Sequence, residues 1–274
     1  PAVTRRRRQS EAPSLPYSDG AKPRTAPNPN EVRYCSHSFG CRANKRFGAG
    51  MRVSSLSSMK KIRVRLGDRS YNILIGRGLI NNCGRILKNL ALGSDAVVIT
   101  NPRVAGLYKY AIEKTLKRNA FTVHFELIAD SEKAKSLSVA SSMLNRLSRY
   151  DLNKRIFRIA LGGGVVGELA GFVASIYKRG VPYVQIPTTL LAQVDSSIGG
   201  KVAVDLDVAK NMVGSFYQPK AVISDVSAMQ TLSSRQIRNG LAEIIKYGVV
   251  KDAALFRYLE SNYKKVLKLD SGAL

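Results

Sequence analysis

The sequence contains few cysteines, few histidines and few acidic residues. Of 274 residues, three are cysteines and two are histidines, and 19 Asp and Glu stand against 44 Lys and Arg, a formal net charge of +25. The cysteines form no CxxC pair, which argues against a zinc ribbon, a redox dithiol or a disulfide scaffold and fits a reducing, cytoplasmic setting. The charge excess indicates an anionic partner: nucleic acid, a phosphorylated metabolite or an acidic surface.

Long apolar runs are also missing from the sequence. No stretch approaches the roughly 18 apolar residues of a membrane span, and the basic start lacks the apolar segment of a secretory signal. We therefore expect no membrane partner. With 45% hydrophobic and 23% charged residues, the chain is expected to fold into roughly two globular domains, at about 150 residues per domain.

Residues 1–58 differ in composition from the rest of the chain. They contain the run Arg5–Arg8, several Pro and Ser residues, three acids and no sustained apolar periodicity. This composition predicts a basic disordered leader. It would also suit a transit peptide, a basic arm that binds nucleic acid, or translated sequence upstream of a natural start at Met59.

From Met59 onward, β-rich runs alternate with amphipathic stretches. Such alternation predicts parallel strands joined by crossover helices, with ligands bound at the carboxyl ends of the strands. Residues 59–230 are therefore assigned to a Rossmann-like α/β domain. The predicted strands are 61–66, 71–75, 96–100, 121–127, 156–161, 181–186 and 221–224, and the predicted helices are 79–90, 104–119, 136–149 and 167–177. Helices over 234–250 and 253–267 predict the start of a second, helical domain in residues 231–274.

A glycine turn lies between the strand at 156–161 and the following helix. Gly162, Gly164 and Gly167 satisfy G-x-G-x-x-G, which lets bare backbone approach a pyrophosphate at a helix N-terminus. The alternative is a tight strand-to-helix turn without a ligand. The motif lies late in the sheet. Pro187-Thr188-Thr189 also stands at the position, about twenty residues on, where an ordinary first Rossmann turn is followed by an acidic residue, so this turn is a poor match to an ordinary first Rossmann turn.

Five ordered runs between Gly162 and Gly248 closely resemble 3-dehydroquinate synthase. The runs are GGGVVGELAG at 162–171, PTTLLAQVDSS at 187–197, GGK at 199–201, KNMVGSFYQP at 210–219 and GLAEIIKYG at 240–248. A weaker resemblance to the same family covers residues 59–161, including Glu132 and Lys135. Together the two stretches extend the resemblance over residues 59–267. It identifies residues 59–230 as an NAD-binding domain and residues 231–274 as the beginning of an all-helical metal-binding domain.

The resemblance implies an NAD-dependent and metal-dependent carbon–oxygen lyase of the shikimate pathway. Such an enzyme converts 3-deoxy-D-arabino-heptulosonate 7-phosphate to 3-dehydroquinate and phosphate. Transient oxidation of a ring carbinol by NAD acidifies the neighbouring C–H; phosphate leaves, the ketone is reduced, and an aldol step closes the new ring. A divalent metal, zinc or cobalt, polarises the carbinol oxygen. The expected substrate is a small phosphorylated sugar acid, and the expected assembly is a homodimer.

Motif position also implies roles for individual residues. The residues expected to bind NAD are Glu132, Lys135, Gly164, Val165, Glu168, Thr188, Thr189, Thr231, Leu232 and Gln236. The expected catalytic residues are Asp195, Lys201 and Lys246. The residues expected to bind the substrate are Arg179, Lys210 and Asn211. Arg179 matches an arginine that reaches the substrate phosphate of a neighbouring subunit. Glu243 matches a metal ligand. Ammonium and guanidinium groups suit a substrate that carries phosphate and carboxylate.

The sequence departs from the family pattern at several positions. Glu168 stands where the family has Asp, and Asp205 and Asp207 add negative charge within 202–209. The two histidine ligands of the metal are absent: His37 lies in the leader and His124 on a predicted strand. We therefore expect a chain truncated before those ligands and inactive alone. Inosose and valiolone cyclases share the motifs, so they stay as alternative functions. A degenerate, non-catalytic homologue and a basic nucleic-acid-binding protein are further alternatives. Glycerol-1-phosphate dehydrogenases and iron-dependent alcohol dehydrogenases fit the motifs less well.

Overall fold

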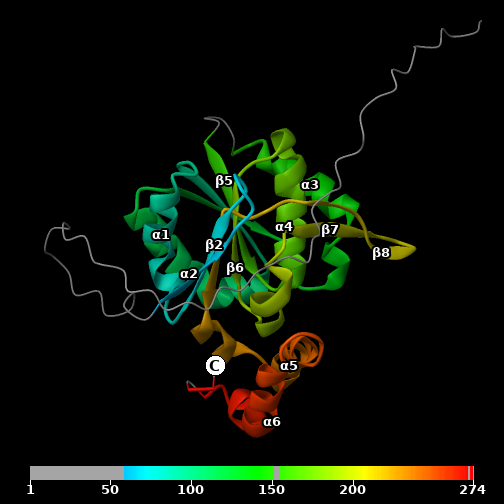
Figure 1. Ribbon diagram of the computed structural model, residues 1–274. Coiled ribbons are helices and arrows are strands. Elements are labelled where there is room, and N and C mark those ends of the chain that lie inside the picture. The colour runs from blue at the N-terminus through cyan, green and yellow to red at the C-terminus, as the bar shows by residue number, and fades with distance from the viewer. Residues whose placement is uncertain (1–58, 151–154, 271, 274) are drawn as a thin grey trace, which may run out of the picture. The chain divides into compact units, whose positions relative to one another are not determined.

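The computed structural model describes residues 59–150, 155–270 and 272–273 and shows a parallel sheet covered by helices (Figure 1). Its strands are β1 (Lys60–Val64), β2 (Tyr71–Gly76), β3 (Asp95–Thr100), β4 (Thr122–Leu127), β5 (Ile156–Gly162), β6 (Tyr183–Pro187) and β9 (Ala221–Asp225). They follow the order β1-β2-β9-β6-β5-β3-β4, and only β1 is antiparallel to its neighbour. The predicted leader, 1–58, lies outside the described residues.

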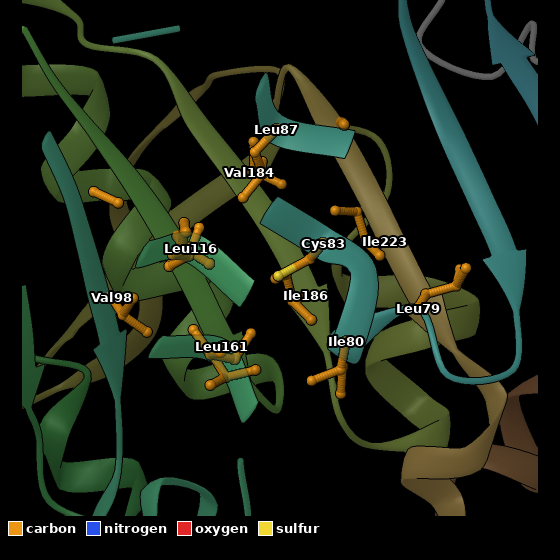
Figure 2. Close-up of a cluster of buried hydrophobic side chains, with 14 of the residues drawn as sticks. Leu79, Ile80, Cys83, Leu87, Val98, Leu116, Leu161, Val184, Ile186 and Ile223 are labelled. Atoms are coloured by element: carbon orange, nitrogen blue, oxygen red, sulfur yellow. The ribbon is translucent and has the colours of Figure 1, made fainter. Parts of the chain in front are cut away.

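Helices pack against both faces of this sheet. They are α1 (Cys83–Leu90), α2 (Pro102–Arg118), α3 (Leu137–Leu147) and α4 (Gly164–Ile176). Figure 2 shows Cys83 and Leu87 of α1 and Leu116 of α2 packed against the β-strand side chains of one face. On the other face, α3 and α4 pack against the alternate residues of the same strands, such as Val97 and Ile99 of β3. Strands β3, β5 and β6 are buried along their whole length, as expected for a parallel sheet between two helical layers.

The predicted α/β class is confirmed, and each predicted strand and helix of the sheet domain is present with shifted ends. The predicted helix 79–90 is a 3-10 turn, Ile80–Asn82, followed by α1. Helix α4 begins at Gly164, one turn before the predicted start at Gly167. Gly167 therefore lies inside this helix, where a Cβ would stand 2.6 Å from Oε1 of the buried Gln185 and would force that side chain to shift.

A two-stranded hairpin was missed by the sequence analysis. It consists of β7 (Lys201–Leu206) and β8 (Ala209–Phe216). Val202 and Val204 are buried against α4, whereas β8 is largely exposed and mixes polar residues with the exposed Met212 and Phe216. Because β8 has no apolar alternation, nothing in its sequence marks it as a strand. A Cβ on Gly171 of α4 would stand 2.4 Å from Cγ1 of Val202, so this glycine permits the close packing of α4 on β7.

Two further helices follow the sheet, as predicted. They are α5 (Ser234–Val250) and α6 (Ala253–Leu267), and they pack on one another through Leu241, Leu259 and Val266. A capping box between Ser233 and Gln236 begins α5. The division into domains at residue 230, and a metal-binding role for the second, stay predictions. Within the ranges that the structure describes, no helix has both the length and the apolar character needed to cross a membrane.

Candidate functional site

The turn between β5 and α4 is tightly enclosed backbone. The amide of Thr188 donates to the Gly162 carbonyl at 2.9 Å, which ties this turn to the end of β6. A Cβ on Gly163 would lie 3.2 Å from Cγ2 of Thr189, and one on Gly164 would lie 3.2 Å from Oγ of Ser196. No side-chain cap covers the first turn of α4. Its N–H groups and the positive end of the helix dipole are therefore available to an anion.

A cleft of about 140 Å³ opens at this turn, at the carboxyl ends of β3, β5 and β6. Seven of the ten residues that the motifs predicted for the cofactor line it: Gly164, Val165, Thr188, Thr189, Thr231, Leu232 and Gln236. The remaining lining residues are Asn101, Arg103, Val104, Leu107, Tyr108, Asp130, Gly163 and Val166. The cleft lies where an open α/β sheet binds its ligands.

Sequence reasoning missed the polar wall of the cleft opposite the glycines. Asn101 Nδ2 donates to Asp130 Oδ1 at 2.7 Å, and Arg103 lies beside this pair in the wall of the cleft. Asn101 also caps α2, because its side chain accepts from the Val104 amide at 2.8 Å. Asn101 and Asp130 follow the neighbouring strands β3 and β4. Their position just after a strand end is the sequence feature that could have identified them as site residues.

Three predicted cofactor residues lie elsewhere, beside the hairpin. Lys135 Nζ forms an ion pair with Glu168 and a hydrogen bond with Asn211 Oδ1, and it lies 3.6 Å from Asp205 Oδ1. Two more predicted residues meet nearby, since Lys210 Nζ lies 3.4 Å from Glu132 Oε1. The structure thus brings Glu132, Lys135 and Glu168 together with the two substrate candidates of β8, and away from the cleft walls. These five roles stay predictions.

A second polar cluster lies where α5 approaches the π-helical turn Ala192–Ser196. Tyr247 of α5 donates its hydroxyl to Asp195 Oδ1 at 3.1 Å. Gln193 holds the π-helical turn in place, because its Nε2 donates to the carbonyls of Pro187 and Asp225 at 3.2 and 2.9 Å. Single π-turns of this kind occur often at functional sites. Tyr247 was not predicted as a site residue, although it lies within the GLAEIIKYG run.

Charges around Tyr247 involve the remaining candidates. Glu243 forms an ion pair with Lys246, three residues further along α5. The hydrogen bond from Lys246 lowers the pKa of Glu243, with a smaller contribution from the charge of Lys201. Burial, followed by the Asp195 charge, raises the pKa of Tyr247, so its hydroxyl stays protonated. Asp195, Lys201, Glu243 and Lys246 therefore belong to one electrostatic cluster.

Arg179 lies at the opposite end of α4 from the glycine turn. It lies in the exposed turn Tyr177–Arg179, beyond the C-terminal end of α4. Helix α4 has 13 residues, so roughly 20 Å separates Arg179 from Gly164. A role for Arg179 at the site of a neighbouring subunit stays a prediction.

The described residues do not form a complete metal site. No group of three or more His, Cys, Asp or Glu side chains suited to a metal is found among them. Glu243 supplies one carboxylate, whereas a zinc site takes at least three protein ligands. His124 lies on β4, a predicted strand, with its ring stacked on Tyr150 at a centroid distance of 4.3 Å.

Comparisons with known proteins agree with this geometry. Residues 125–239 match the family described as 3-dehydroquinate synthase N-terminal. Over 216 residues, 79% of this chain, the sequence is 48% identical to 3-dehydroquinate synthase of Desulforamulus reducens and covers 60% of it. The same stretch is 47% identical to 3-dehydroquinate synthase of Pelotomaculum thermopropionicum and covers 58% of it. The chain thus spans about three fifths of the length of these curated relatives.

Two solved structures of sugar phosphate cyclases have a similar fold. The 2-epi-5-epi-valiolone synthase of Streptomyces hygroscopicus subsp. jinggangensis, solved with NAD+ and Zn2+, is 28% identical with a TM-score of 0.67, over 84% of this chain and 59% of that one. A 2-deoxy-scyllo-inosose synthase, solved with carbaglucose-6-phosphate, NAD+ and Co2+, is 28% identical with a TM-score of 0.63, over 68% of this chain and 50% of that one.

The sheet order and the cleft at the glycine turn define the class: a Rossmann-like nucleotide-binding domain of the type found in sugar phosphate cyclases. Within this class, the chain is similar to the 3-dehydroquinate synthases, and the resemblance seen in its motifs is confirmed.

Proposed function

We propose that this chain carries the NAD-binding part of a 3-dehydroquinate synthase, the enzyme that converts 3-deoxy-D-arabino-heptulosonate 7-phosphate to 3-dehydroquinate and phosphate. One observation carries the proposal: the cleft at the first turn of α4 is lined by seven residues that the family motifs assign to NAD. The same proposal includes a cytoplasmic homodimer in which Arg179 serves the neighbouring subunit.

The lining of the cleft suits the pyrophosphate and ribose of a dinucleotide. Bare backbone at Gly163 and Gly164 leaves room for the pyrophosphate, and the α4 N-terminus attracts its charge. Asn101 and Asp130 offer a hydrogen-bonding pair at the next strand ends, which suits ribose hydroxyls. NAD, when bound, supplies the hydride acceptor for a transient oxidation.

The cluster around Tyr247 suits the substrate. Lys201 and Lys246 are cations that would bind phosphate or carboxylate oxygens, and Asp195 is oriented by the Tyr247 hydroxyl. Glu243 would be one ligand of the zinc or cobalt ion. The described residues do not supply the other ligands of that ion.

Calorimetric titration of the 274-residue chain with NAD tests the proposal. In Gly164→Val the new Cβ would lie 3.2 Å from Oγ of Ser196, so the branched side chain crowds the turn that the pyrophosphate must approach, and we expect NAD affinity to fall by more than about tenfold with the fold retained. Gly106→Val is the matched control, because Gly106 lies on the exposed side of α2 with open space around its Cβ position. Absence of NAD binding by the unaltered chain, or equal affinity in both variants, would refute the proposal.

A second candidate function is another sugar phosphate cyclase of the inosose or valiolone type. It is favoured by the two solved relatives with those activities and by Glu168 and Asp205, which depart from the 3-dehydroquinate synthase pattern. A substrate panel, tested on a chain extended to the full length of its relatives, separates the two by measuring phosphate release. Release from the heptulosonate phosphate supports the first function. Reaction only with a hexose or heptulose phosphate that lacks the carboxylate supports the second.

A further inference from the structure

Lys135 is a buried ammonium group surrounded by three elements of the fold. Its side chain is 4% exposed although the preceding residues of its own 3-10 turn, Glu132 and Lys133, are exposed. Its Nζ contacts Glu168 of α4, Asn211 of β8 and, at 3.6 Å, Asp205 of β7. Because a buried ion is costly to desolvate, this position persists only through these partners.

Backbone contacts fasten the hairpin at the same point. The amide of Asp205 donates to the Lys135 carbonyl at 2.8 Å, and a β-bridge joins Ser136 to Asp205. Asp205 Oδ1 in turn accepts from the Asn211 amide at 2.8 Å. One aspartate therefore joins Lys135 to both strands of the hairpin.

The conformation of Asn211 depends on these contacts. Its φ is +59°, in the left-handed region, and the pairing of β7 with β8 shifts register between Val204 and Leu206, opposite this residue. Asparagine tolerates this conformation better than most residues, but an exposed strand would not adopt it without support. The amide contact to Asp205 and the side-chain contact to Lys135 supply that support.

The exposed pair nearby contributes little. Lys210 and Glu132 are 70% and 50% exposed, and their closest atoms are 3.4 Å apart. Exposed pairs of this kind stabilise a protein weakly because solvent screens them and two flexible side chains must be ordered. Among the charged contacts of the hairpin, those of the buried Lys135 therefore contribute most.

We propose that Lys135, Glu168 and Asp205 form a buried ionic lock in which Lys135 is a positioning residue: it holds the β7–β8 hairpin against α4 and so places Lys210 and Asn211 relative to the glycine turn. Glu168 lies one helical turn after Gly164, so the lock connects the hairpin to the helix that forms the cleft. That Lys210 and Asn211 serve a substrate rests on the proposed function; the lock itself does not. It also involves two of the three acidic departures from the family pattern, since Glu168 and Asp205 each meet Lys135.

Amide hydrogen exchange of the ligand-free 274-residue chain tests the lock. In Lys135→Met the apolar stem stays, but two carboxylates lose their shared cation. We expect the amides of residues 209–214 to exchange at least about tenfold faster, while those of β5, residues 156–162, change by less than about twofold. Lys133→Met is the matched control, because Lys133 is an exposed lysine of the same turn and should leave both sets unchanged.

A combined variant distinguishes the lock from general loosening. If Glu168 acts through Lys135, then adding Glu168→Gln to Lys135→Met should accelerate hairpin exchange less than Glu168→Gln does alone. Additive effects, equal acceleration in β5, or hairpin exchange unchanged in Lys135→Met would each overturn the proposal. If Lys135→Met does not fold, Asp205→Asn decides: the Asn211 amide should exchange several-fold faster, and an unchanged rate refutes the lock.

These measurements need no NAD or substrate. If the exchange results support the lock but the chain binds no NAD, the proposed function is refuted and the lock stands. If the chain binds NAD but hairpin exchange does not depend on Lys135, the lock is refuted and the proposed function stands.

Discussion

The cleft at the glycine turn and the cluster beside the hairpin are built in different ways. The glycine side of the cleft is backbone: Gly163, Gly164 and a helix N-terminus that lacks a side-chain cap, with side chains from the neighbouring strand ends around it. The hairpin cluster is mostly charged side chains, with Lys135 paired to carboxylates from α4 and β7. A site made of backbone follows from the local fold, whereas a site made of side chains depends on which distant segments meet. The cleft should therefore tolerate changes in surrounding charge, and the cluster should not.

The strongest test of this contrast is the packing of the hairpin on α4. In Gly171→Ala the new Cβ would lie 2.4 Å from Val202, so the hairpin or the helix must shift. We expect a loss of about 2 kcal/mol in the free energy of unfolding, measured by urea denaturation. The exposed control, Gly106→Ala, should be neutral or slightly stabilising, because alanine favours a helix over glycine. Equal stability of Gly171→Ala and the unaltered chain would show that the hairpin does not rest on α4.

A smaller effect is expected where α5 meets the π-helical turn. Tyr247→Phe removes the hydroxyl that donates to Asp195, at a cost of about 1 kcal/mol in urea denaturation. The pKa of Tyr247 is raised, so its contribution is fully present below the ordinary value of about 10 and is lost as the pH rises through the higher folded-state value.

Tyr258→Phe serves as the control for this test, because Tyr258 is a 42% exposed tyrosine of α6. Its replacement should change stability much less. If both variants lose the same amount, the Asp195 contact contributes nothing measurable, and the assignment of Tyr247 as the residue that orients Asp195 fails.

The smallest effect is expected for an exposed ion pair, which calibrates the buried lock. Glu113 and Lys117 pair across one turn of α2 at 2.6 Å. The hydrogen bond from Lys117 lowers the pKa of Glu113, so its contribution is present above the ordinary carboxyl pKa and is lost as the pH falls through the lowered value. Glu113→Gln should cost only about 0.3–0.5 kcal/mol at pH 7, and the difference should vanish in acid. If Glu113→Gln lowered the free energy of unfolding by about 2 kcal/mol, as expected for Gly171→Ala, the exposed ion pair would not be weak and the distinction between exposed and buried charges would fail.

Sequence reasoning reached most of the fold and part of the site. The strands and helices of the sheet domain were predicted because apolar periodicity is local and strong, and the cleft was predicted because Gly162 and Gly164 mark a turn that only backbone can fill. The β7–β8 hairpin was missed because its exposed strand β8 has no apolar alternation, although Val202 and Val204 alternate in β7. Asn101, Arg103 and Asp130 were missed because they join the cleft only through the order of β5, β3 and β4 in the sheet.

What the sequence determined by itself is the α/β class, the glycine turn and the relation to 3-dehydroquinate synthase, each of which is written in contiguous residues. The tertiary structure alone decided which charges meet. Lys135 lies 33 residues from Glu168 and 70 from Asp205 along the chain, and Tyr247 is separated from Asp195 by 52. Such contacts form because packing α4, α5 and the hairpin on the sheet brings these polar groups together, and burial then requires each charge to find an opposite one.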